Sequence, residues 1–317
     1  MHYIFEFAIF FILFFSAYWI YIIVRSFFYD KKSGINTRIK RSAILIPLVL
    51  IFIFVFYGSF IEPRRLAITN VNINLNQADG SAKLKIAFIS DMQLGPYKQA
   101  GYLTKIVDKI IALKPDIVLL GGDYIENKEA QAGYLAPLKN LADRFPVFSV
   151  TGNHEFNQSR PADKRYRDNT ASLRKLFKEW NIEILDNANR ILTVNGSNIA
   201  ICGIEDIWTG RADLTKAGAD IPAGIPKILL AHNPDIILDN KSEDFNLILS
   251  GHTHAGQFRL PWIGPIVPVP TNLGRAFDYG LFKLKNNYLY ITSGLGESGA
   301  RARLFCKPEI AIINLNL

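Results

Sequence analysis

Five short segments of the chain join an apolar run to polar side chains that can bind a metal ion or transfer a proton. The apolar part of each is typical of a buried strand, and the polar residues follow where that strand would end. The segments are Ile89-Ser90-Asp91-Met92-Gln93, Leu120-Gly121-Gly122-Asp123, Val150-Thr151-Gly152-Asn153-His154-Glu155, Leu230-Ala231-His232-Asn233-Pro234 and Leu249-Ser250-Gly251-His252-Thr253-His254. Because the carboxyl ends of strands in open α/β sheets converge on one crevice, we expect these polar side chains to meet there.

The histidines give the clearest indication of the chemistry. The chain has five, and all four that lie beyond residue 2 fall within these segments. They are His154, His232, His252 and His254. Side chains alternate along a strand, so His252 and His254 would point to the same side. With the carboxylates of Asp91 and Asp123 and the amide of Asn153, the imidazoles suit borderline divalent ions such as Mn²⁺, Fe²⁺ or Zn²⁺. These ligands are enough for two ions that share one carboxylate.

In order and spacing, the segments resemble the calcineurin-like metallophosphoesterase superfamily. Its motifs are Asp-x-His, Gly-Asp-x-x-Asp, Gly-Asn-His-Glu/Asp, a separate His and Gly-His-x-His, and the resemblance runs from about residue 84 to the C-terminus. Further residues resemble a membrane-anchored bacterial branch of it: Gly251-His252-Thr253-His254-Ala255-Gly256-Gln257, Leu260-Pro261, Gly294-Leu295-Gly296, Arg303 and Lys307-Pro308-Glu309. The resemblance implies an α/β fold, a four-layer αββα sandwich, and the activity of a metal-dependent phosphoric ester hydrolase.

The resemblance also implies a role for each residue at a matching position. Two divalent ions would be bound, with manganese favoured and iron or zinc as alternatives. The ligands would be Asp123, shared by both ions, with Asp91, Gln93 and His254 for the first ion and Asn153, His232 and His252 for the second. The family mechanism is in-line attack on phosphorus by a hydroxide that bridges the ions. His154 would act with Asp123 in catalysis, by stabilising the transition state or by protonating the leaving oxygen.

Two positions depart from the family pattern. Gln93 stands where the family usually has a histidine ligand, and its amide oxygen is a neutral, weaker donor. We therefore expect the first ion to be held less tightly, to be a harder ion such as Mn²⁺, or to be reached through water. Glu126 occupies the position of the second aspartate in Gly-Asp-x-x-Asp. Neither change removes Asp123 or His154, so we expect an active enzyme, and a metal-binding sensor or scaffold with little turnover is the alternative.

Four further polar or reactive residues have two interpretations each. Glu155 and Asp235 would either orient the imidazoles of metal ligands or serve as helix caps and solvent-facing acids. Cys202 and Cys306 both lie in apolar, strand-like runs. Two buried free thiols are therefore favoured over a disulfide, whose geometry would have to fit.

The rest of the soluble part supplies the strands and helices that would position these residues. Early βαβ patterns give way to strand-rich sequence, which predicts two packed sheets with helices outside. Strands are expected at 85–90, 117–120, 147–150, 182–185, 191–194, 198–203, 227–231, 246–250, 288–292 and 309–315, and helices at 103–113, 135–141 and 170–180.

The first sixty residues differ in composition from the rest. Residues 7–24 and 43–61 are uncharged apolar runs, and a helix of that length covers roughly 27 Å, close to the thickness of a bilayer's hydrocarbon core. A buried core helix and a cleaved signal peptide are the alternatives. Neither run has a polar face, however, and residues 1–6 lack the basic charges of a signal peptide. The predicted organisation is a two-helix transmembrane anchor at 1–61, with a basic loop at 25–42, a linker at 62–72 and a metallophosphoesterase domain at 73–317.

The distribution of charge predicts the orientation in the membrane. The net charge is +8, and residues 1–61 carry six Lys or Arg, all within 25–42, against two acids. The positive-inside rule places that loop in the cytoplasm. The catalytic domain of a bacterial inner-membrane protein would then lie in the periplasm. The remaining charge, +8 − 4 = +4, is spread thinly and accompanies no nucleic-acid-binding module, so we expect no nucleic-acid partner. Protein partners are left open.

A membrane anchor favours a substrate at the membrane surface, such as a lipid or lipid-linked phosphodiester or pyrophosphate. A related activity is hydrolysis of UDP-2,3-diacylglucosamine, a lipid A precursor, but that substrate belongs to the cytoplasmic face and conflicts with the predicted orientation. The basic segment 157–180, with seven Lys or Arg, would contact an anionic head group or form a solvated helix face. Candidate substrate contacts, each close after a ligand motif, are Tyr97, Phe156, Gln257, Phe258 and Arg259.

Overall fold

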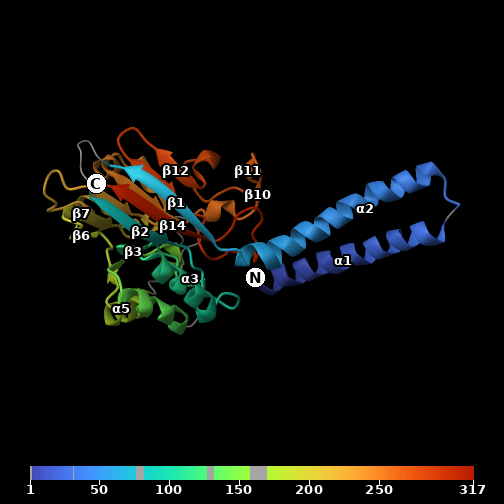
Figure 1. The fold of residues 1–317 in the computed structure, drawn as a ribbon, viewed down its shortest axis with the longest axis horizontal. Helices are drawn as coiled ribbons and strands as arrows, with labels where there is room; N and C mark the ends of the chain where they lie inside the picture. The colour runs from blue at the N-terminus through green and yellow to red at the C-terminus, as the bar shows by residue number, and fades with distance from the viewer. Residues whose placement is uncertain (1, 31, 76–81, 127–131, 158–169) are drawn as a thin grey trace.

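The computed structural model describes residues 2–30, 32–75, 82–126, 132–157 and 170–317. Two long helices extend from a domain that contains two six-stranded sheets (Figure 1). Helices cover the outer face of each sheet, so the predicted four-layer αββα sandwich is confirmed.

The first sheet has the strand order β1-β14-β2-β3-β4-β5. Its strands are β1 (Ala67–Asn74), β2 (Lys83–Ile89), β3 (Ile117–Leu120), β4 (Val147–Ser149), β5 (Glu183–Ile184) and β14 (Glu309–Asn316). From β2 to β5 all neighbours are parallel, so the carboxyl ends of these strands lie at one edge. The helical elements of this half are α3 (Ala100–Leu113), the 3₁₀ helix η3 (Ala132–Leu138), α4 (Lys139–Ala142) and α5 (Thr170–Glu179).

The second sheet has the order β12-β13-β9-β8-β7-β6. Its strands are β6 (Ala188–Val194), β7 (Ser197–Gly203), β8 (Lys227–Leu230), β9 (Leu247–Ser250), β12 (Gly280–Lys283) and β13 (Tyr288–Ile291). The four central strands are parallel to one another. The short helices η5 (Ile207–Thr209), α6 (Leu214–Ala217) and η6 (Pro234–Leu238) follow these strands, and a hairpin of β10 (Arg259–Leu260) and β11 (Gly264–Pro265) stands apart.

Alternation along the central strands builds both sides of the first sheet. On β2, Ile86 and Phe88 belong to the core between the sheets, whereas Ala87 and Ile89 belong to the core beneath the helices. Ile106 and Ile110 of α3 are buried against that outer face. Strands that are apolar on both faces are typical of sheets covered on both sides, and this burial fixes the height at which each strand ends.

Three sequence-based assignments need correction. Residues 62–72 are not simply a linker, because β1 begins at Ala67 and pairs with β14 along its whole length. The segment 135–141 is mostly a 3₁₀ helix that contains Pro137, which lacks the N–H that an α-helix needs there. Strand β12 was missed because its side chains are at least partly exposed. Edge strands such as β1 and β12 carry little apolar signal.

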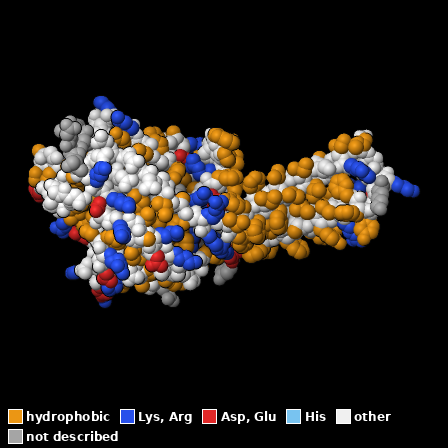
Figure 2. All heavy atoms as spheres, in the orientation of Figure 1, with side chains coloured by type: hydrophobic (Ala, Val, Ile, Leu, Met, Phe, Trp, Pro, Cys, Tyr) orange, Lys and Arg blue, Asp and Glu red, His pale blue; other side chains and the backbone are white. Residues whose placement is uncertain are grey.

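The two N-terminal helices are α1 (His2–Tyr29) and α2 (Ile35–Phe56), and a π-helical turn, η1 (Tyr57–Ile61), continues α2. Both are long and apolar enough to cross a membrane. Figure 2 shows that apolar side chains cover them, whereas the Lys and Arg of the connecting loop lie at the far end. Such surfaces would be costly in water over this length and are normal in lipid.

The ends of both helices contact the two-sheet domain. Glu6 of α1 forms an ion pair with Arg301, at 2.8 Å. The rings of Phe54 in α2 and Phe305 lie 6.1 Å apart, and the backbone N–H of Arg303 donates to the carbonyl of Gly58. The loop 301–305 therefore joins the helix pair to the domain.

Candidate metal centre

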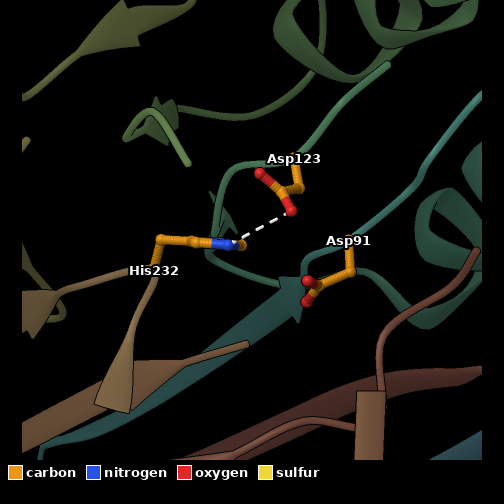
Figure 3. Close-up of side chains that lie close together, drawn as sticks. All are labelled: Asp91, Asp123 and His232. Carbon is orange, nitrogen blue, oxygen red and sulfur yellow. Dashed lines mark ion pairs between the residues drawn. The ribbon is translucent and has the colours of Figure 1, made fainter. Parts of the chain in front are cut away.

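Strand ends from both sheets deliver the predicted metal ligands to one place. Strands β2, β3 and β4 of the first sheet precede Asp91, Asp123 and Asn153, and β8 and β9 of the second precede the histidines. Ligand atoms of Asp91, Asp123 and His232 all lie within 4.8 Å of one another, and all three residues are buried. Figure 3 shows the imidazole of His232 facing the Asp123 carboxylate, with the Asp91 carboxylate beside them.

The backbone at this centre is held in an uncommon conformation. Five of the seven predicted ligands have left-handed backbone angles: Asp91 (φ 52°), Gln93 (φ 44°), Asp123 (φ 56°), His252 (φ 67°) and His254 (φ 48°). Residues other than glycine seldom adopt this region, and such strain concentrates at functional sites. The sharp turns after the strands explain these backbone angles, because each turn must place a side chain over the edge of the sheet.

Two glycines let the backbone approach the carboxylates closely. A Cβ on Gly152 would lie 2.3 Å from Oδ1 of Asp123, and one on Gly251 would lie 2.1 Å from Oδ2 of Asp91. Neither distance is possible for a real side chain. Each glycine therefore allows the next motif to pack directly against a carboxylate, where backbone N–H groups bind it: that of His154 donates to Asp123 and that of His252 to Asp91.

Backbone carbonyls fix the orientation of two of the ligand imidazoles. Nδ1 of His232 lies 2.8 Å from the carbonyl of Gly121, and Nδ1 of His254 lies 3.2 Å from that of Gly296. A carbonyl only accepts hydrogen bonds, so Nδ1 must carry the proton in both rings, and Nε2 faces the carboxylates. Nε2 of His232 lies 3.3 Å from Oδ2 of Asp123, and Nε2 of His254 lies 3.5 Å from Oδ1 of Asp91.

A second group of potential metal-ligand atoms lies around the side-chain amide of Asn153. Its Oδ1 lies 3.2 Å from Nε2 of His232 and 3.0 Å from Nδ1 of His252. The two imidazole nitrogens are themselves 3.3 Å apart. Three potential metal-ligand atoms, from the residues that follow β4, β8 and β9, thus converge on one point next to Asp123.

Buried polar atoms test whether the group fits a metal ion. Among the described residues, Oε1 of Gln93 and Nε2 of His252 are buried and have no hydrogen-bond partner. Nε2 of Gln93 donates to Oδ2 of Asp123 at 2.9 Å, so the Gln93 amide lies against the carboxylate predicted to be shared. An unsatisfied buried oxygen is costly. Oxygen and imidazole donors around carboxylates fit divalent cations.

The electrostatics of the centre also favour bound cations. Burial alone would raise the pKa of Asp123, but neighbouring His232 and His154 lower it well below its usual range. Burial lowers the pKa of His252 and His254, which keeps both imidazoles neutral, as metal ligands must be. Burial would also lower the pKa of His232, but Asp123 raises it well above its usual value. The carboxylates therefore attract positive charge strongly.

Glu155 anchors the backbone around the shared aspartate. Its carboxylate accepts hydrogen bonds from the N–H groups of Gly152, Asp123 and Tyr124, at 2.8–3.0 Å. Of its two predicted roles, capping is therefore what the structure shows, and carbonyls do the work of orienting the imidazoles. Burial raises the pKa of Glu155 to about 7. Asp235 likewise binds backbone and side-chain groups of Asn272 and holds that loop.

His154 lies beside the ligand group and is partly open to solvent. Its side chain is 26% exposed, in contrast to the buried histidines, and its Nε2 lies 3.9 Å from Oδ2 of Asp123. Nδ1 lies 3.2 Å from the carbonyl of Glu126, which fixes the ring. His154 can therefore reach a group that approaches from outside.

The predicted substrate residues differ in accessibility. Tyr97 is half-buried, with the Arg301 guanidinium 4.2 Å above its ring. Phe156 is fully buried, so the prediction that it lines a pocket is wrong. Its ring packs in the interior, with the Arg211 guanidinium 5.2 Å from the ring centroid. Gln257 is mostly buried and binds the backbone of Ser298.

Two other predicted substrate contacts, Phe258 and Arg259, lie at the β10–β11 hairpin. Arg259 forms an ion pair with Asp278 and donates to the carbonyl of Ala255. Phe258 is half-buried and forms a bridge with Leu304. Of the basic segment 157–180, residues 158–169 lie outside the described part of the chain. Cys202 and Cys306 are buried free thiols, as predicted.

Two residues near the centre were missed by sequence reasoning. Trp208 lies perpendicular to His252, with ring centroids 4.6 Å apart. Asp206 is buried, and burial raises its pKa to about 7. Both follow strand β7, so the rule that polar residues at strand ends meet would have found them as a sixth segment.

Arg303 positions the predicted ligand His254 through the backbone of a neighbouring loop. It is fully buried, and its guanidinium donates to the carbonyls of Ser293, Gly294 and Gly296. The Gly296 carbonyl in turn lies against Nδ1 of His254. Its Nε lies 3.3 Å from the carboxylate of Glu297. Burying a charged side chain is costly unless it is paired or hydrogen-bonded, and these partners explain why Arg303 can hold this loop from a buried position.

Gln93→His is expected to tighten binding of the first ion, because an imidazole nitrogen is a stronger donor than a neutral amide oxygen. The Mn²⁺ dissociation constant, measured by isothermal titration calorimetry, should fall by roughly tenfold. Gln99→His, an exposed position at the start of α3, is the matched control and should leave it unchanged. Unchanged or weaker binding in Gln93→His would place the Gln93 side chain outside the ligand set.

Comparison with known proteins gives a consistent result. Residues 84–256 match the family described as calcineurin-like phosphoesterase. Phosphodiesterase YaeI of Escherichia coli is 30% identical over 243 residues, which are 75% of this chain and 84% of that protein. F40B5.2 of Caenorhabditis elegans is 30% identical over 302 residues, 89% of this chain but 60% of that protein. A bovine "transmembrane protein with metallophosphoesterase domain" is 30% identical over 77% of this chain and 56% of its own length. The chain thus spans little more than half of the two animal proteins.

Proposed function

Because the chain belongs to the calcineurin-like phosphoesterase family and is a metal-dependent phosphoric ester hydrolase, we propose that it acts at a membrane. Its substrate would be a phosphodiester or pyrophosphate of a lipid or lipid-linked molecule. The observation that carries the hydrolytic part is the buried group of oxygen and imidazole donors around Asp123, with His154 at its open side.

Two divalent ions, when bound, would lower the pKa of a water molecule and neutralise phosphoryl oxygens. Asp123 would be shared, with Asp91, Gln93 and His254 on one side and Asn153, His232 and His252 on the other. His154 presents Nε2 toward an incoming phosphate. When protonated there, it would donate a hydrogen bond to a phosphoryl oxygen or the proton to the leaving oxygen.

The membrane part of the proposal rests on the helix pair and on a nearby apolar hairpin. Trp262, Ile263 and Ile266 around β10 and β11 are all more than half exposed. The hairpin is joined through the Phe258–Leu304 bridge to Phe305, which touches α2 at Phe54. This continuity supports a domain whose surface rests on the bilayer. The basic loop at the far end of the helices supports an orientation with the domain across the membrane from the cytoplasm.

The proposal predicts metal-dependent turnover by the full-length protein in detergent. Bis-p-nitrophenyl phosphate should be hydrolysed with Mn²⁺, and removal of metal by a chelator should abolish the reaction because the carboxylates alone cannot activate water. Metal content should be measured on the same samples. Stoichiometric metal with no turnover would instead support a sensor or scaffold. Accumulation of an intact phosphodiester or pyrophosphate lipid in cells that lack the protein would support the lipid substrate.

A further inference from the structure

A cavity of about 290 Å³ lies where the transmembrane helix pair meets the domain. Ser59 and Pro63, which follow α2, form one wall, and α3 forms another. We call it the junction cavity. Its volume is at the lower end for small-molecule sites, so it suits a polar head group rather than a whole lipid.

Basic side chains dominate the lining of this cavity. They are Arg64, Lys98, Lys105, Lys109 and Arg301, and Glu297 is the one acid among the described lining residues. Glu297 is already paired with Lys98, at 2.7 Å between nearly buried side chains. Arg301 is paired with Glu6 of α1, so Arg64, Lys105 and Lys109 leave an excess of positive charge at the cavity. Figure 2 shows Lys and Arg gathered on the domain beside the helices.

Two lysines are placed so that both face the cavity. Lys105 and Lys109 are exposed and lie four residues apart on α3, on one side of the helix. Like charges at this spacing repel each other, which is mildly destabilising unless an anion lies between them. The pair therefore places two positive charges at the wall of the cavity, where a bound anion would offset their repulsion.

The cavity lies at the depth where lipid head groups would be found. Its wall at Ser59 and Pro63 belongs to the last turns of the second candidate span, Ile35–Arg64, where a spanning helix leaves the hydrocarbon core. Arg301, which also lines the cavity, pairs with Glu6 near the start of α1. Basic residues at this level attract anionic lipids.

The junction cavity also leads toward the metal centre. Tyr97, Lys98, Glu297 and Arg301 line a second, much smaller cavity whose other wall includes Gln93. The Gln93 amide contacts Asp123. A head group held in the junction cavity would thus be separated from the ligand group by one layer of side chains.

We propose that the junction cavity binds the phosphate of an anionic membrane lipid through Lys105, Lys109, Arg64 and Arg301. This deepens the proposed function and rests on its membrane anchoring, since it assigns the substrate an anionic head group. The sequence offered a different candidate for this contact, the basic segment 157–180, with a solvated helix face as its alternative role. Lys175 and Lys178 are two exposed lysines of that segment and lie on α5. Helix α5 lies farther from α1 and α2 than α3 does (Figure 1).

The test measures binding of labelled phosphatidylglycerol to the full-length protein in a neutral detergent, with phosphatidylcholine as the uncharged reference. Lys105→Ala/Lys109→Ala should weaken binding of phosphatidylglycerol by roughly tenfold or more. Alanine keeps α3 helical, and Lys105→Gln/Lys109→Gln is the substitute if the first variant does not fold. Lys175→Ala/Lys178→Ala removes the same charge from α5 and should bind as the wild type does.

Equal loss in both double variants, or loss in the α5 variant alone, would overturn the proposal. Inorganic phosphate is added as a competitor to distinguish a lipid phosphate from free phosphate as the ligand. If inorganic phosphate displaces labelled phosphatidylglycerol at concentrations as low as those of the lipid itself, the site is one for free phosphate. Turnover of bis-p-nitrophenyl phosphate by the wild type is measured in parallel. Failure there with intact lipid binding would contradict the proposed hydrolase, whereas unaltered lipid binding by the cavity variant would contradict only this inference.

Discussion

Asp123→Asn is expected to abolish metal-dependent hydrolysis, with a loss of roughly 10³-fold or more in kcat/KM. The carboxylate stands between both groups of donors: Oδ2 lies 2.9 Å from Nε2 of Gln93 and 3.3 Å from Nε2 of His232. Asparagine keeps the size of the side chain but removes the charge that two cations would share. The measurement is steady-state hydrolysis of bis-p-nitrophenyl phosphate with Mn²⁺, together with metal content.

The matched control is Asp108→Asn, which makes the same change at an exposed position of α3. Its turnover and metal content should equal those of the wild type. In Asp123→Asn, metal content should fall along with turnover. Undiminished turnover would remove the assignment of Asp123 as the shared ligand, and with it the two-ion centre.

The expectation that polar residues at strand ends lie together follows from topology. Parallel strands must end at the same edge, so Asp91 and Asp123 meet although they are 32 positions apart in the sequence. The same reasoning joins His232 from the other sheet, since the two sheets pack with their carboxyl ends together. The burial needed to fix those strands was visible in the apolar runs themselves.

The sequence could not show which groups hold the ligands in place. Orientation of His232 and His254 depends on the carbonyls of Gly121 and Gly296, and every residue has a carbonyl. Backbone partners leave no signature in residue type, so acids such as Glu155 were the only visible candidates. The position of β1 was hidden for a related reason: its partner β14 lies at the other end of the chain.

The exposed apolar surface formed by the hairpin and loop 301–305 was also beyond local reasoning. Trp262 and Phe305 are far apart in sequence, and each alone is an ordinary exposed apolar residue. The fold connects the hairpin to loop 301–305 and that loop to α2. The junction cavity likewise combines α3 with residues from both ends of the chain. Such sites become visible only once the packing is known.

His154→Ala is expected to lower kcat by roughly 10²–10⁴-fold while metal content stays near that of the wild type. The imidazole lies outside the buried ligand group, partly exposed and 3.9 Å from Asp123. Its loss therefore removes a donor to the substrate without removing a predicted ligand. This separates it from Asp123→Asn, in which metal content falls too. His2→Ala, which removes the histidine outside the five segments, should retain full activity.

The leaving group decides which of the two roles His154 has. p-Nitrophenolate departs readily without a proton, whereas an alkoxide needs one. If His154 protonates the leaving oxygen, His154→Ala should slow hydrolysis of an alkyl phosphodiester much more than hydrolysis of the p-nitrophenyl ester. An equal loss with both substrates would assign His154 to stabilising charge on the phosphoryl oxygens, as other fixed donors do. Loss of metal from His154→Ala would contradict both roles, because it would make the residue a ligand.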